Sequence, residues 1–206
     1  MAYFVLNALG PAGGSELEET AELGYRNFVF RLEVENFRFQ LAFISGLFPT
    51  REAYDYDPEG TPGLLDPPPK LETEIAVVDI GRAQIMSIPG ELDPALFVGG
   101  YDGSFTPMGI PIVTETRDNP PDLTMAPDGP YLRDLARADA DFVYLFGLSN
   151  DEIGYFIPAF DFQLGAIEWI GEAPGDHYEE TVSPSREVWP TIEGYMQELL
   201  AWTAED

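Results

Sequence analysis

Oxygen-bearing side chains follow apolar runs at two places in this chain. Glu91 ends the segment IPGE, and Tyr155 ends the segment GLSNDEIGY, which begins at residue 147. Because an apolar run predicts a strand, each segment would deliver its oxygen donor to the rim of a sheet, where α/β folds often carry metal ligands and catalytic groups. Structural roles are the alternative: Glu91 as a helix cap, Tyr155 as a core aromatic, and residues 150–152 as a turn.

The chain is strongly acidic. Its 206 residues include 37 Asp and Glu but only 10 Lys and Arg, which gives a formal charge of −27. Such a charge repels nucleic acid and anionic membrane surfaces, so we expect neither as a partner. Lys70 is the one lysine, and we would expect such a lysine-poor, acidic surface in a protein that works in high salt, where repulsion is screened. Adaptation to high salt is therefore a hypothesis.

Composition also limits the fold and the kinds of site that the chain can form. A hydrophobic fraction of 45% suffices for one domain with a sizeable core, and zero cysteines exclude disulfides and thiolate metal sites. No apolar run reaches the roughly 18 residues that span a bilayer. The first ten residues lack the cationic start of a signal peptide and read as a buried strand, which suggests missing upstream sequence.

Hydrophobic periodicity predicts a single α/β domain with a mixed β-sheet and packed helices. Ser15 and Glu18 have capping-box spacing and predict a helix over residues 15–25. Alternating apolar residues predict a strand over 28–34, and a second set, 37–43, predicts another strand or a short helix. Further strands are expected at residues 75–80, 83–88, 142–148 and 153–157, and further helices at residues 91–98, 131–138 and 187–203.

Two long acidic loops rich in Gly and Pro separate these elements, at residues 49–70 and 99–130. Inside the first loop, a calcium-loop template matches at its positions 1, 3, 5, 6 and 12, which are Asp55, Asp57, Glu59, Gly60 and Asp66. The match is imperfect, because Asp stands where the template has a bidentate Glu and two prolines interrupt the loop. A plain solvated loop is the alternative.

The order of these motifs resembles that in neutral and alkaline non-lysosomal ceramidases and their bacterial relatives. The segment IPGE comes first, then GLSN with Gly154-Tyr155, then Tyr178-Glu179 with Ser183, and then an amphipathic helix. This is similar to the C-terminal half of that family's catalytic domain. The whole chain, residues 1–206, would then be part of a larger catalytic domain.

The resemblance implies a hydrolase with zinc as its cofactor. In the family the Glu of the first motif and the Tyr of the second are zinc ligands, so Glu91 and Tyr155 would be metal ligands here. The residues implied around them are Asn150, His177, Tyr178 and Glu179. The resemblance also implies an N-acyl lipid or a related amide as substrate, a place in sphingolipid metabolism, and a secreted or periplasmic protein.

Two departures from the family concern its zinc ligands and its nucleophile. The family's other zinc ligands are upstream histidines, which have no counterpart because His177 is the only histidine. The family's nucleophilic serine follows an apolar strand, whereas residues 4–13 hold no serine in register and Ser15 stands two positions late. The sequence therefore assigns no catalytic residue.

Two functional hypotheses follow. The first is the C-terminal part of a ceramidase-like zinc amidohydrolase, inactive alone, for which upstream residues or another chain supply the histidines. Its chemistry is coherent, because zinc held by oxygen ligands and imidazoles activates water and polarises an amide carbonyl. The second is a non-catalytic binding or structural module that keeps the fold but has lost the zinc site and the nucleophile.

Overall fold

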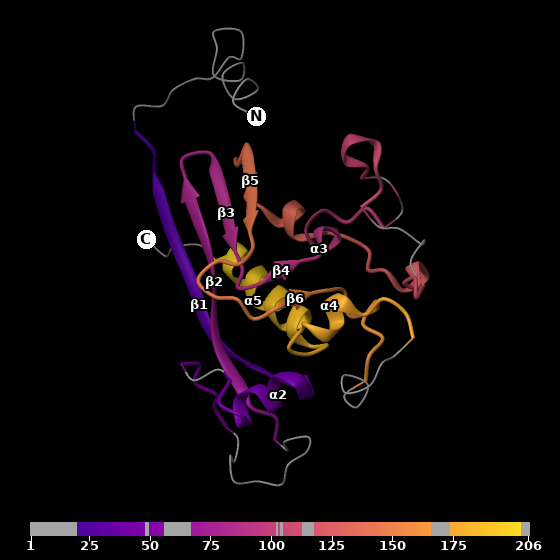
Figure 1. The fold of residues 1–206 in the computed structure, drawn as a ribbon. Coiled ribbons are helices and arrows are strands. Elements are labelled where there is room, and N and C mark those ends of the chain that lie inside the picture. The colour runs from indigo at the N-terminus through magenta and orange to yellow at the C-terminus, as the bar shows by residue number, and fades with distance from the viewer. Residues whose placement is uncertain are drawn as a thin grey trace, which may run out of the picture.

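A mixed sheet forms the centre of this computed structural model, in the strand order β1-β2-β3-β5 (Figure 1). β1 (Leu23–Glu33) and β2 (Lys70–Ile80) are antiparallel, as are β2 and β3 (Ala83–Ser87), whereas β5 (Phe142–Phe146) runs parallel to β3. The structure describes residues 20–47, 50–55, 67–101, 103, 105–112, 118–165 and 174–202.

Two very short strands and several helices complete the described chain. β4 (Glu91–Leu92) and β6 (Tyr155–Phe156) pair in parallel as a separate two-stranded sheet. The helices are α2 (Phe37–Ile44), α3 (Pro94–Val98), α4 (Tyr178–Thr181) and α5 (Val188–Ala201), with single 3₁₀ turns at η1 (Pro107–Gly109), η2 (Leu123–Met125) and η3 (Leu132–Leu135). None of the described helices is long and apolar enough to cross a bilayer.

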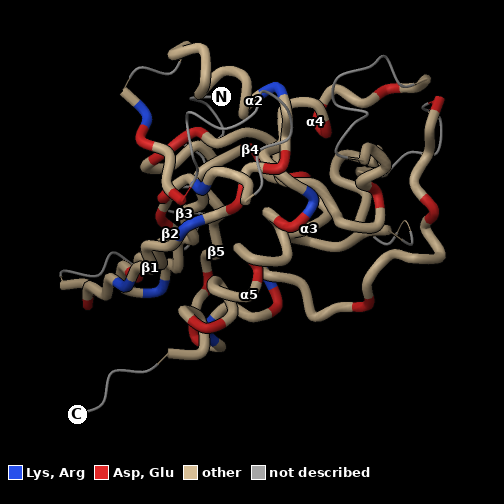
Figure 2. The backbone as a smooth tube through the Cα atoms, turned by 90° about the horizontal axis from the view of Figure 1, so that it is seen from below, with Lys and Arg blue, Asp and Glu red and all other residues tan. Residues whose placement is uncertain are grey.

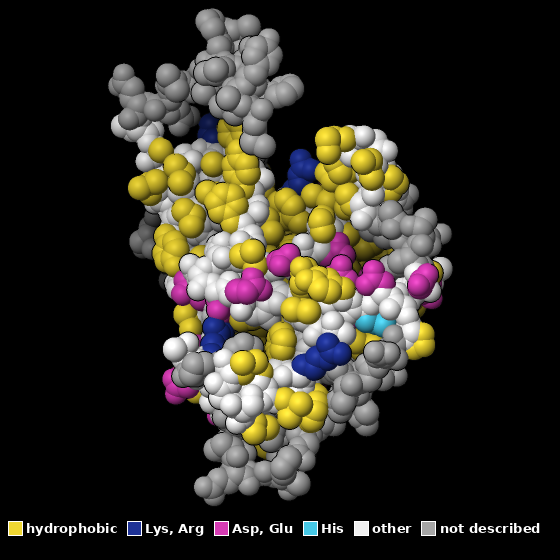
Figure 3. Space-filling view, in the orientation of Figure 1, with side chains coloured by type: hydrophobic (Ala, Val, Ile, Leu, Met, Phe, Trp, Pro, Cys, Tyr) yellow, Lys and Arg dark blue, Asp and Glu magenta, His cyan; other side chains and the backbone are white. Residues whose placement is uncertain are grey.

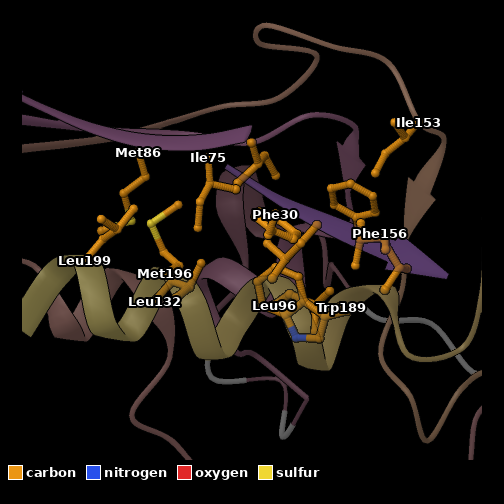
Figure 4. Close-up of a cluster of buried hydrophobic side chains, with 14 of the residues drawn as sticks. Phe30, Ile75, Met86, Leu96, Leu132, Ile153, Phe156, Trp189, Met196 and Leu199 are labelled. Carbon is orange, nitrogen blue, oxygen red and sulfur yellow. The ribbon is translucent and has the colours of Figure 1, made fainter. Parts of the chain in front are cut away.

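One face of the large sheet is buried beneath α5. The pairing sets Val77 of β2 opposite Met86 of β3, and both side chains are fully buried. Ile75 and Met86 point from the sheet toward Met196 and Leu199 of α5 (Figure 4). Burying an aliphatic side chain of this size stabilises the fold by about 1.5–3 kcal/mol, so this seam between sheet and helix dominates the core.

The opposite face of the sheet carries apolar side chains that remain exposed. Strand alternation puts Tyr25 of β1, Val78 of β2, Ile85 of β3 and Tyr144 of β5 in one row across this face. Tyr25 is 63% exposed and Tyr144 is 47% exposed. The other exposed apolar residues of this face are Leu23, Val29, Ile80, Phe142 and Phe146. Figure 3 shows hydrophobic side chains gathered over β3 and β5.

A partly buried ion pair ties the sheet to the end of α5. The Arg26 guanidinium lies 2.5 Å from an Asp79 carboxylate oxygen and also donates to the Leu199 carbonyl at 2.7 Å. Gln84 donates to the second Asp79 oxygen at 2.9 Å. Burial by itself raises the pKa of Asp79, but these donors outweigh it and hold the pKa below its usual value.

Elsewhere acidic positions outnumber basic ones along the backbone (Figure 2).

The predicted fold class, a mixed sheet with packed helices, is confirmed. α5 matches the helix predicted over residues 187–203, and β2, β3 and β5 contain most of the predicted strand residues. Residues 37–43 form a helix, the second of the two predicted alternatives, because the Asn36 side chain accepts from the Arg38 amide and caps it.

Three predicted helices need correction. Residues 23–25 belong to β1, and the rest of the predicted helix 15–25 up to residue 19 lies outside the described residues, as does the N-terminal strand. The helix predicted from Glu91 begins instead at Pro94, since the Asp93 carboxylate caps it by accepting from the Ala95 amide at 2.8 Å. Residues 131–138 hold only the 3₁₀ turn η3.

Candidate functional site

Backbone hydrogen bonds join the motif segments into one unit. The Leu148 amide donates to the Gly90 carbonyl at 3.0 Å, and the Glu91 amide donates to the Gly154 carbonyl at 3.0 Å. The Tyr155 amide in turn donates to the Val182 carbonyl at 3.2 Å, which brings in the third motif. Segments that are far apart in the sequence therefore lie side by side at the rim where β3 and β5 end.

Glycines make this close approach of the backbones feasible. A Cβ on Gly90 would lie 2.3 Å from the Gly154 carbonyl oxygen, and a Cβ on Gly147 would lie 2.7 Å from the Gly90 carbonyl oxygen. At Gly154, φ is +110° and a Cβ would lie 2.0 Å from the Val182 carbonyl oxygen. Each of these positions excludes a side chain for a steric reason.

Glu91 and Tyr155 face each other directly in the β4–β6 ladder. Their neighbours Leu92 and Phe156 form the next pair, so register and side-chain direction are shared. Glu91 is exposed and lies outside the helix, because Asp93 holds the cap. The structure thus removes the capping role that the sequence offered for Glu91.

Tyr155 is the centre of a small polar cluster. Its ring meets that of Tyr178 edge to face, with centroids 5.5 Å apart. Hydrogen bonding to Tyr178 raises the pKa of the Tyr155 phenol above its ordinary value, with further increases from burial and from hydrogen bonding to Glu91. A phenol in this position is held neutral and aimed at the Glu91 carboxylate.

A pocket of about 310 Å³ opens beside this pair. Glu91 and Tyr155 form part of its wall, and Glu179 of α4 lies on the same wall. The other acidic residues that line it are Asp93, Asp161, Asp176 and Glu180. We call this the acidic pocket. Sequence reasoning did not assign to the site either Asp93, which caps α3, or Asp161, which lies in a turn after β6.

His177 is engaged in a structural pair. Its Nδ1 lies 2.6 Å from Glu180 Oε1, and its Nε2 lies 3.0 Å from the Pro174 carbonyl oxygen. Burial alone lowers the pKa of His177, but the hydrogen bond to Glu180 and the one to Pro174 outweigh it and raise the pKa. With an acceptor at each ring nitrogen, the charged imidazolium satisfies both.

The other oxygen of Glu180 fastens a loop. It accepts from the backbone amides of Gln163 and Leu164 at 2.7 and 2.6 Å, and Glu180 is 4% exposed. The pair of His177 and Glu180 therefore holds α4 against the loop that bounds the acidic pocket. In the sequence, the signal for the pair of His177 and Glu180 was the presence of acidic residues close to His177.

The turn that follows β5 is structural. Asn150 has φ of +67°, and its amide nitrogen lies 3.5 Å from Glu74, so it is not among the residues that line the acidic pocket. Arg51 donates to both oxygens of Asp151, at 2.5 and 2.7 Å, and Thr73 donates at 3.0 Å. Burial raises the pKa of Asp151, but these donors outweigh it and lower the pKa. The hydrogen bond from Thr73 to Asp151 anchors residues 150–152 to β2.

Of the zinc ligands that the resemblance implies, the described residues include the two oxygen donors but no available imidazole. Glu91 and Tyr155 offer two neighbouring oxygen ligands, whereas His177 has both ring nitrogens committed. Within the described ranges, no group of three or more His, Cys, Asp or Glu converges closely enough to hold a metal ion. Most of the proposed calcium loop lies outside those ranges, and Asp55 lies 3.4 Å from the Lys70 ammonium.

A scan of protein-family models and searches of curated proteins and of solved structures found no match to this chain.

Proposed function

We propose that this chain is the C-terminal part of a ceramidase-like zinc amidohydrolase that cleaves an N-acyl amide. The observation that carries the proposal is the β4–β6 ladder, in which Glu91 and Tyr155 are direct neighbours in the wall of the acidic pocket. Their oxygens would supply two zinc ligands, the Tyr155 phenol releasing its proton as the metal binds, and zinc bound there would activate water and polarise the amide carbonyl.

Histidine ligands would come from a further polypeptide segment, either upstream residues or another chain. A second copy of this chain is a poor source, because each copy's His177 already has an acceptor at both ring nitrogens. The exposed apolar face of the sheet supports a further covering layer, since α/β sheets with helices on one face alone leave such a surface in water. That face ends at Phe146, next to the backbone unit that carries Glu91.

Zinc content and amide hydrolysis test this proposal in the protein purified from its natural source. We expect zinc by elemental mass spectrometry, hydrolysis of a fluorescent N-acyl sphingosine, and loss of both in a Glu91→Ala variant. Glu198→Ala removes an exposed carboxylate from α5 and is the matched control. An active protein that contains no zinc would contradict the proposal.

A non-catalytic module is the second candidate, and one observation favours it. The single histidine serves the fold through Glu180 rather than the acidic pocket. A purified chain that unfolds cooperatively, binds no zinc and gains none from any natural partner would support this candidate over the enzyme.

A further inference from the structure

A second pocket, of about 270 Å³, lies between α5, η3 and the turn that follows β6. Aromatic rings dominate its wall, and one carboxylate, that of Glu193, stands among them. The rings are those of Tyr101, Tyr131, Phe160 and Trp189. We call this the aromatic pocket; it shares no lining residue with the acidic pocket.

Packing holds these rings in place. The Tyr101 ring meets Phe160 edge to face at 5.4 Å between centroids and lies 6.0 Å from Tyr131. A Cβ on Gly99 would lie 2.1 Å from the Tyr131 ring, so the backbone packs flat against that ring. The Tyr131 hydroxyl donates to the Pro127 carbonyl at 2.9 Å. The wall is therefore built before any ligand arrives.

Two polar groups of this wall lack partners. The Tyr101 hydroxyl oxygen is buried and has no hydrogen-bond partner within the part of the chain that the structure describes. Glu193 makes no hydrogen bond or ion pair with any residue that the structure describes, and burial raises the pKa of its carboxyl. Burial likewise raises the pKa of Tyr101, and the charges of Asp93 and Asp161 add to the effect. An unpaired polar group that is buried, as the Tyr101 hydroxyl is, is costly and indicates a missing partner, whereas the partly buried Glu193 carboxylate is left for a ligand or water.

We propose that the aromatic pocket binds a compact organic cation of the alkylammonium class. Ring faces attract a cation through their quadrupole, and this attraction strengthens as water is excluded. Glu193 supplies the opposite charge, and the formal charge of −27 draws cations toward the chain. The carboxylates of Asp93 and Asp161 act electrostatically on Tyr101 and give this region a negative potential, which attracts a cation and repels an anionic ligand. The inference is independent of the zinc proposal.

Isothermal titration with choline tests the inference, with 3,3-dimethyl-1-butanol as the uncharged probe of the same shape. Both titrations use the complete chain at one constant ionic strength, because added salt screens charge. We expect saturable choline binding that is at least about tenfold tighter than binding of the alcohol.

Variants assign the binding to the pocket. Glu193→Gln should weaken choline binding about tenfold, whereas Glu198→Gln, an exposed carboxylate on the same helix, should leave it unchanged. Phe160→Leu keeps an apolar side chain but removes a ring face, and it should weaken binding severalfold. Circular dichroism melting confirms that each variant is folded.

Three outcomes would overturn the inference. They are equal affinity for the two probes, absence of saturable choline binding, and wild-type affinity in a folded Glu193→Gln variant. Equal affinity would make the pocket an ordinary apolar groove.

Discussion

Replacing Gly154 with alanine should destabilise the chain far more than a methyl group normally does. A Cβ at this position would lie 2.0 Å from the Val182 carbonyl oxygen, and φ is +110°, a conformation that is strained for every residue except glycine. Strain of this kind costs about 1–3 kcal/mol.

Relief of the clash must also move the backbone. The movement separates Gly154 from the Glu91 amide and Val182 from the Tyr155 amide, and each lost hydrogen bond costs about 1 kcal/mol. The total is therefore about 3–5 kcal/mol, out of the roughly 5–15 kcal/mol that a domain of ordinary stability has.

Urea unfolding followed by circular dichroism measures this difference, and Gly194→Ala is the control. Gly194 lies inside α5 with nothing within 4 Å of an added Cβ. Alanine there should stabilise the chain by about 0.5–1 kcal/mol, because glycine is a poor helix former. If Gly154→Ala costs less than about 1 kcal/mol, the backbone unit of the motifs is not as tightly interlocked as we infer.

Three further predictions concern charge and protonation. Because the pKa of His177 is raised in the folded state, protonated His177 stabilises the fold fully below about pH 6.5, and this stabilisation is lost as the pH rises through the folded pKa. The His177→Gln variant should show a flatter decline in the free energy of unfolding over this range. An equally steep decline would contradict the pair of His177 and Glu180. Tyr178→Phe should lower the pKa of Tyr155 toward about 10 in a titration followed by tyrosine ¹³Cζ NMR, and an unchanged value would show that Tyr178 has no influence. The melting temperature should rise from dilute buffer to molar potassium chloride as repulsion is screened, and a flat profile would remove high-salt adaptation.

Periodicity predicted the elements whose burial is one-sided and failed where capping decided. α5 and the strands of the large sheet follow apolar spacing, because each buries one face against the other. The start of α3 depends on which of two acids, Glu91 or Asp93, bonds to the backbone. Both are reasonable caps by type, and only the pairing of β4 with β6 excludes Glu91.

The candidate site was partly predictable for a related reason. The motifs contain Gly90, Gly147 and Gly154, which allow their backbone segments to pack closely against one another. The segments that carry Glu91 and Tyr155 could therefore be identified in the sequence. The part of the acidic pocket that contains Asp161 could not be predicted from the sequence. Asp161 arrives there through a turn held by Glu180, and neither residue stands at a spacing that marks such a contact.

The motif glycines, however, do not separate an enzyme from a module, because both need the same backbone unit. The side chains that can separate them are those the fold does not need. Glu91 is exposed and caps no helix, and Tyr155→Phe removes only a hydroxyl from a ring that packs against the small cluster of Ile157, Phe162 and Leu164. We therefore expect Glu91→Gln and Tyr155→Phe to change the free energy of unfolding by no more than about 1 kcal/mol in urea titrations, because the hydrogen bonds that they affect are partly exposed to solvent. If either variant instead unfolds the chain, its side chain serves the fold, and a loss of zinc or hydrolysis in that variant would say nothing about chemistry.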